Sequence, residues 1–206
     1  MNDKRSITDS FFDDLNDIIN NPNVEEHQPE LIPYKNGYMI DGDYEFDGKL
    51  DKKIIMVTGD VRVDFYVESL KGCPEEIHGE FNCEGCDKLT SLEGGPKFVG
   101  EAYNCGWCKN LKSLKGGPVY AREFNCQHCD NLESLEGAPE EVDKFDCSNC
   151  KKLTSFKGCP KIVNESFDCC DCENIVSLEY APTNSGCSIL SDNCTAFEKY
   201  NDVLDV

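Results

Sequence analysis

The sequence predicts a repeat solenoid built on a parallel β-sheet, and three observations indicate it. An aromatic-x-Cys-x-x-Cys-x-x-aliphatic-x-Ser motif occurs five times. Its copies recur every 21 or 22 residues, starting at Phe81, Tyr103, Phe124, Phe145 and Phe167. Each copy begins with alternating apolar and polar residues and continues into a stretch that contains Gly and Pro. Fixed periods of this length are typical of stacked repeat architectures.

Within one copy, the first half predicts a strand and the second half a non-helical return. Phe81 and Cys83 alternate with polar Glu80, Asn82 and Glu84, which is the period of a half-buried strand. Copies stacked about 4.8 Å apart would share a continuous interior. Gly and Pro close together oppose a helix, so we expect the return to be extended or turn-like. The prolines concerned are Pro96, Pro118, Pro139, Pro160 and Pro182.

The repeat resembles the leucine-rich repeat, whose core line is Leu-x-Leu-x-x-Asn/Cys-x-Leu. Phe81 and Cys83 occupy the two strand Leu positions, Cys86 the Asn/Cys position and Leu89 the next Leu. The resemblance covers residues 69–182 and implies a concave, ligand-facing sheet surface. The amino-acid sequence of the copies is similar to that of short repeats in tailed phages, giant viruses and bacterial effectors, and this resemblance implies a viral or effector protein.

Three regions follow from this pattern. Residues 1–60 are expected to form an N-terminal capping or contact region, with a helix over 9–20, a hairpin turn at 35–37 and strands between Tyr44 and Phe65. Residues 61–182 form the solenoid, with a shortened first repeat before the five full ones. Residues 183–206 form a C-terminal cap, in which Phe197, Tyr200, Val203 and Leu204 make a short helical stripe after Thr195.

Charge and composition exclude several classes. The chain has 40 acidic and 20 basic residues and a net charge of −20. This charge opposes direct binding to nucleic acid or to an anionic membrane, and it favours solubility. It leaves open an inhibitor that mimics nucleic acid. With no apolar signal core, no long apolar run and fifteen cysteines, a cytoplasmic, reducing location is expected.

The cysteines have two interpretations. The pairs Cys83/Cys86, Cys105/Cys108, Cys126/Cys129, Cys147/Cys150 and Cys169/Cys172 have the spacing of zinc ligands, so a metal-stapled structural protein stays an alternative. They also sit where the repeat requires small interior groups, and free Cys is among the most buried residue types. We therefore expect buried, reduced thiols and no metal or cofactor. Cys170 is the repeat cysteine expected to point outward.

The outward strand positions predict where a partner binds. Solenoids commonly use this surface for extended contacts, and Trp107 is the only Trp in the chain. The alternatives are that Trp107 packs on its own loop, and that the Asn/Asp and Ser columns only stabilise the stack. No catalytic constellation is present, so we expect a non-catalytic protein-binding module. The expected contact residues are Glu80, Asn82, Glu84, Asn104, Trp107, Glu123, Gln127, His128, Lys144, Asp146 and Asp168.

Overall fold

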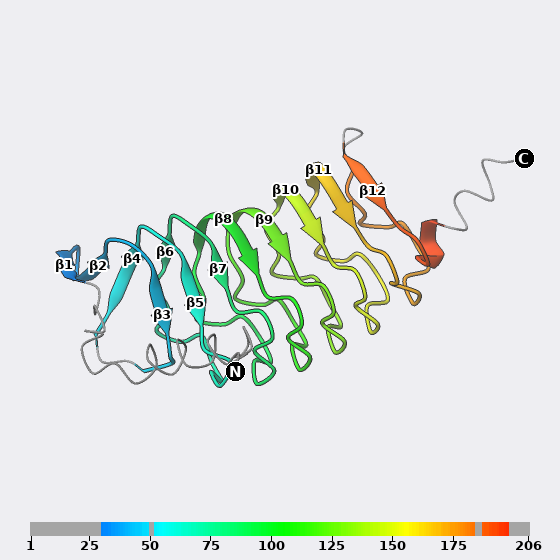
Figure 1. The fold of residues 1–206 in the computed structure, drawn as a ribbon. Helices are drawn as coiled ribbons and strands as arrows, with labels where there is room; N and C mark the ends of the chain where they lie inside the picture. The colour runs from blue at the N-terminus through cyan, green and yellow to red at the C-terminus, as the bar shows by residue number, and fades with distance from the viewer. Residues whose placement is uncertain (1–29, 50–51, 184–186, 198–206) are drawn as a thin grey trace, which may run out of the picture.

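The computed structural model is a parallel-strand β-solenoid of about seven turns, with almost no helix among the described residues (Figure 1). The structure describes residues 30–49, 52–183 and 187–197. We call one winding of the chain a coil. The strands are β1 (Leu31–Tyr34), β2 (Gly37–Ile40), β3 (Tyr44–Phe46), β4 (Ile54–Val57), β5 (Val61–Val63), β6 (Glu76–Ile77), β7 (Phe81–Asn82), β8 (Phe98–Asn104), β9 (Tyr120–Asn125), β10 (Glu141–Asp146), β11 (Ile162–Asp168) and β12 (Ser188–Leu190).

The coils pair in parallel, with equivalent repeat positions side by side. Tyr103 pairs with Phe124, Phe124 with Phe145, and Phe145 with Phe167. In β9, Ala121 and Phe124 are three residues apart and both are buried. Strict alternation would put them on opposite faces, so the strand bends between them. The bend leaves two consecutive residues on the face away from the core in β9 and β10, whereas three residues separate the buried positions in β8 and β11.

Columns of identical chemistry fill the interior. The Phe124 ring lies 5.2 Å from that of Tyr103 and 5.8 Å from that of Phe145, and both pairs are stacked. All five Cys-x-x-Cys pairs are fully buried, and no disulfide bond joins cysteines in the described part of the chain. The structure therefore confirms the expectation that the paired cysteines are small interior groups.

In four of the five pairs, the second Cys also satisfies a backbone group of the preceding coil. Its Sγ donates to the carbonyl oxygen of that coil's first Cys, from Cys108 to Cys83 at 3.1 Å and from Cys150 to Cys126 at 3.1 Å. Cys129 and Cys172 donate in the same way, each at 3.2 Å. Buried carbonyls need a partner. A thiol supplies one here while occupying little more space than a methyl group.

The return segments are turns without helix, as predicted. Ser91, Ser113, Ser134, Ser155 and Ser177 each accept a hydrogen bond from the backbone N–H two residues later, which confirms the turn role of the Ser column. At Gly116 the backbone has φ +90°, and a Cβ there would overlap the backbone of Glu93 in the preceding coil. Glycine is required at this position on both grounds.

The ends of the solenoid differ partly from expectation. The hairpin is confirmed, because β1 and β2 pair antiparallel across the Lys35 turn. The parallel ladder also crosses residue 61 without a break, since β2 pairs with β4 and β3 with β5. Phe65, predicted in a strand, lies in a turn and is 68% exposed. The predicted helix over 9–20 lies outside the described residues. Residues 195–197 are helical, and the rest of the predicted C-terminal stripe lies outside them.

Candidate functional site

Most of the expected contact residues gather in two hollows. Glu80, Asn104, Glu123, Lys144, Asp146 and Asp168 line a hollow of about 350 Å³ over the outward face of β8–β11. We call this face, turned away from the core, the outer sheet face. Asn82, Glu84 and Trp107 line a second hollow of about 740 Å³ beside the preceding coils. Gln127 and His128 line neither, although His128 stacks on Trp107.

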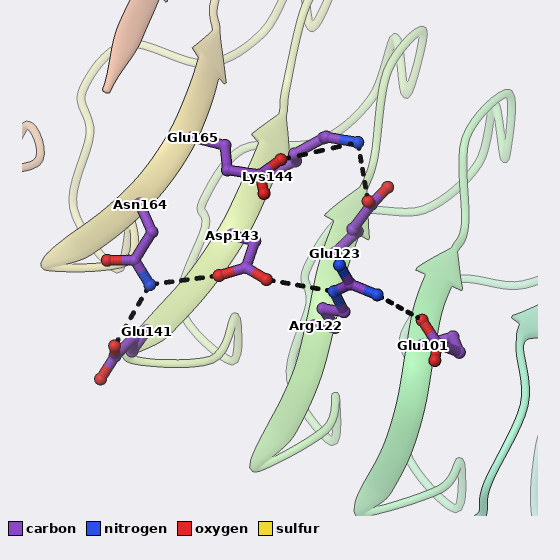
Figure 2. A network of polar contacts seen from close by, with 8 residues as sticks. All are labelled: Glu101, Arg122, Glu123, Glu141, Asp143, Lys144, Asn164 and Glu165. Carbon is purple, nitrogen blue, oxygen red and sulfur yellow. Dashed lines mark hydrogen bonds and ion pairs between the residues drawn. The ribbon is translucent and has the colours of Figure 1, made fainter. Parts of the chain in front are cut away.

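A ladder of charges, made of two separate chains of contacts, crosses the outer sheet face (Figure 2). Arg122 bridges two coils, with Nη1 3.1 Å from Glu101 Oε2 and Nε 3.1 Å from Asp143 Oδ2. Lys144 lies 2.8 Å from Glu123 Oε1 and 3.8 Å from Glu165 Oε2. Each cation therefore lies between acids of the neighbouring strands.

Acids outnumber bases on this face, and its cations are already paired. Hydrogen bonds to Asp143 and Glu101 raise the pKa of Arg122, and a hydrogen bond to Glu123 raises the pKa of Lys144. Both cations are solvent-exposed, so the pairs position side chains and contribute little stability. Glu101, Glu141 and Glu165 leave the face with an excess of negative charge. It is suited to a positively charged partner surface.

The Asn/Asp column has a structural role beyond those expected from the sequence, which were partner contacts or side-chain ladders along the sheet. Contact of this column with a partner stays a prediction. In five successive coils Oδ1 accepts the backbone N–H two residues later, at Asn82, Asn104, Asn125, Asp146 and Asp168. Burial raises the pKa of Asp146, against hydrogen bonds from Ser148 that lower it. These side chains close the turn that follows each strand.

The same turns carry an exposed aromatic stack between two of the expected contact residues, Trp107 and His128. The Trp107 and His128 ring centroids are 3.8 Å apart with an interplanar angle of 17°. Both residues have left-handed backbones, at φ +58° and φ +54°. Trp107 packs on the neighbouring coil and is still 42% exposed. The Trp107 side chain therefore packs on the neighbouring coil and still exposes surface that a partner could contact.

Sequence reasoning missed two exposed aromatics and part of the charge ladder. Phe65 and Tyr66 are 68% and 77% exposed, and both line the larger hollow with Trp107. The available signal was two adjacent aromatics after a Val-x-Val strand. Arg122 and Asp143 were missed because the bend in each strand turns an extra residue outward.

Burial raises the pKa of several interior thiols, which makes them poorly suited to redox or metal chemistry. Burial raises the pKa of Cys86 to about 12, and it raises the pKa of Cys105 well above 9.0. Contact with the thiol of Cys108, followed by burial, raises the pKa of Cys83. Burial also raises the pKa of Cys170 to about 11, so this half-buried residue is not the low-pKa thiol that a redox role needs.

Metal binding needs thiolates, and raised thiol pKa values oppose it. Among residues 30–49, 52–183 and 187–197, no three His, Cys, Asp or Glu side chains are grouped as metal ligands. No helix in the same ranges is long and apolar enough to cross a membrane. The absence of metal stays a prediction.

Comparisons with protein-family models, curated proteins and solved structures find no match. Membership of the leucine-rich repeats therefore stays a prediction, and the functional argument depends on the geometry of this chain.

Proposed function

We propose that this protein is a non-catalytic binding module that holds a basic protein partner against its outer sheet face. The observation that carries the proposal is the charge ladder of β8–β11, in which Arg122 and Lys144 are enclosed by acids of neighbouring strands. An ordered, acid-rich face on a rigid sheet offers complementary charge to Lys and Arg side chains. Nine of the expected contact residues line the two hollows.

Charge reversal on opposite sides of the solenoid tests this. Glu101→Lys with Glu165→Lys alters the outer sheet face, where these side chains are 55% and 53% exposed. Glu93→Lys with Glu136→Lys makes the same charge change on the returns, at 60% and 58% exposure. Partners captured from lysate by the wild type are then titrated against both double variants. We expect about tenfold weaker binding for the first pair only. Equal effects of the two pairs would contradict the proposal.

The same acid-rich face keeps nucleic-acid mimicry as the second candidate. A mimic occupies a nucleic-acid-binding surface of its partner. Captured partners should then be released by added DNA or RNA, and binding should weaken steeply with salt. A complex that neither DNA nor RNA dissociates would exclude nucleic-acid mimicry, and general protein binding would remain the proposed function.

A further inference from the structure

Three exposed aromatic side chains lie in the turns of the two coils that flank the coil of Gly85. Phe65 and Tyr66 belong to the preceding coil and Trp107 to the following one. A methyl group added at Gly85 would contact the Phe65 ring at 3.9 Å and, outside its chain neighbours, no other residue within 4 Å. The space between Gly85 and Trp107 is therefore open. We call it the Gly85 slot.

The Gly85 slot lies beside the exposed face of Trp107. His128 covers one face of the Trp107 ring, and the hollow of about 740 Å³ lies at the side of Gly85. Backbone bonds from Gly85 N to Gly106 O (2.9 Å) and from Trp107 N to Gln127 O (2.8 Å) fix the spacing of the turns. Two coil spacings separate the backbones of the Phe65 and Trp107 turns by about 10 Å. The Phe65 ring lies over Gly85, where a Cβ would be 3.9 Å from it, so the open surface of the slot is the face of Trp107 that His128 does not cover.

The charges around the slot select a cation. Glu45, Asp47, Asp64 and Glu84 line the hollow, with Arg62 as the one base of the lining. Asp47 is already paired with Lys49 at 2.7 Å, so Glu45, Asp64 and Glu84 are the carboxylates that would pair with a bound cation. A guanidinium group is planar, always charged, stacks on aromatic faces and pairs with carboxylates in a bidentate manner. A lysine ammonium group carries the same charge but is not planar, so it cannot stack face to face on an aromatic ring.

We propose that the Gly85 slot binds one arginine side chain of the partner protein, stacked on the free face of Trp107 and paired with the surrounding carboxylates. This inference rests on the proposed function and specifies the chemistry that is recognised. It also accounts for the position of the hollow, beside the acid-rich outer sheet face over which the rest of a basic segment would lie.

Trp107 is the only tryptophan of the chain, so its fluorescence reports directly on the slot. The full-length protein is titrated with a blocked Gly-Gly-Arg-Gly-Gly peptide and with versions carrying lysine, citrulline or phenylalanine in place of arginine. We expect a saturable change with arginine and about tenfold weaker binding of citrulline, which keeps the plane and loses the charge. An equal response to citrulline or phenylalanine would assign the slot to a neutral or apolar group and overturn the proposal.

Substitution of Gly85 gives the matched test. Gly85→Asn fills the slot, and the fold accepts it because Asn149 and Asn193 hold the same left-handed conformation at φ +58° and φ +57°. The control Asn149→Gly makes the reverse change away from the slot. We expect Gly85→Asn to abolish the arginine response and Asn149→Gly to keep it. Phe65→Ala, a change at an exposed side chain, should also reduce it. An undiminished response in Gly85→Asn would overturn the slot.

The outcomes separate the slot from the proposed function. If arginine peptides fail to bind while Glu101→Lys with Glu165→Lys still weakens partner binding, the slot is wrong and the binding face stands. If the charge reversals have no effect while Gly85→Asn abolishes arginine binding, the slot stands and the wider face is wrong. Failure of both would remove both proposals.

Discussion

Mild alkali should unfold this protein, because its interior is a column of thiols that cannot ionise in place. Nine thiols that are at most 8% exposed have their pKa raised above the ordinary value of 9.0. They belong to Cys73, Cys83, Cys86, Cys105, Cys126, Cys129, Cys147, Cys159 and Cys169. In the unfolded chain each would ionise near pH 9.0, so proton release there favours unfolding.

The sign and the size follow from linkage. A group whose folded pKa is raised contributes full stability below its unfolded pKa and loses it as pH rises towards the folded value. At about pH 9.5, each thiol that stays protonated in the fold costs slightly less than about 1 kcal/mol relative to the unfolded chain. Nine such thiols together cost about 8 kcal/mol, which is comparable to the whole stability of an ordinary domain.

Urea unfolding followed by circular dichroism, in the presence of a reductant, measures this directly. The urea midpoint should fall steeply between about pH 8 and about pH 9.5. Cys73→Ala with Cys159→Ala serves as the matched variant, because Ala138 and Ala181 occupy the same repeat position. Losing two of the nine thiols should reduce the pH dependence by about one fifth. A midpoint that stays constant up to about pH 9.5 would refute the reasoning.

Four further outcomes are expected. Tyr103→Phe should raise stability by about 1 kcal/mol, because its buried hydroxyl has no hydrogen-bond partner in the described chain; a lower urea midpoint would contradict this. Phe124→Ala should cost about 3–5 kcal/mol and Cys126→Ala about 1 kcal/mol in the same assay, so equal losses would contradict the packing argument. Chelator should leave the circular dichroism spectrum unchanged, and native mass spectrometry should find no stoichiometric zinc. Trp107→Asn should change stability by less than about 1 kcal/mol and abolish binding of the arginine peptide, which isothermal titration calorimetry measures because this variant has no tryptophan; a larger loss of stability would give Trp107 a structural role.

The central coils could be predicted because each carries its own complete chemical signal. The strand alternation at Phe81 and Cys83, the Gly and Pro of the return and the Ser of the turn recur in every copy. The structure confirms the parallel sheet, the buried cysteines and the Ser hydrogen bonds from these local signals. Repetition made the prediction secure, since one short strand alone would have been ambiguous.

The first coils could not be predicted in the same way, because their interiors use other residues at other spacings. Ile40, Val57 and Ile77 occupy one buried column at separations of 17 and 20 residues, without Cys pairs. Because the first 60 residues were interpreted as a separate capping region, the sequence did not indicate that β3, β5 and β7 pair in one parallel ladder. The Gly85 slot was hidden with them, since Phe65 was assigned to a strand. A site made by neighbouring coils depends on register, and register was clear only where the repeat was regular.

The backbone at Trp107 gives an independent reason to treat this residue as functional. The equivalent positions Gly85, Asn149, Asp171 and Asn193 hold residue types that tolerate a left-handed backbone, and each has positive φ. A bulky aromatic in this conformation is costly, by about 1–2 kcal/mol. Stacking on His128 returns about 0.5–1.5 kcal/mol, so the two effects nearly cancel. Fold stability therefore gives no reason to place a half-exposed Trp where Asn fits without strain, whereas binding of a cation to its free face does.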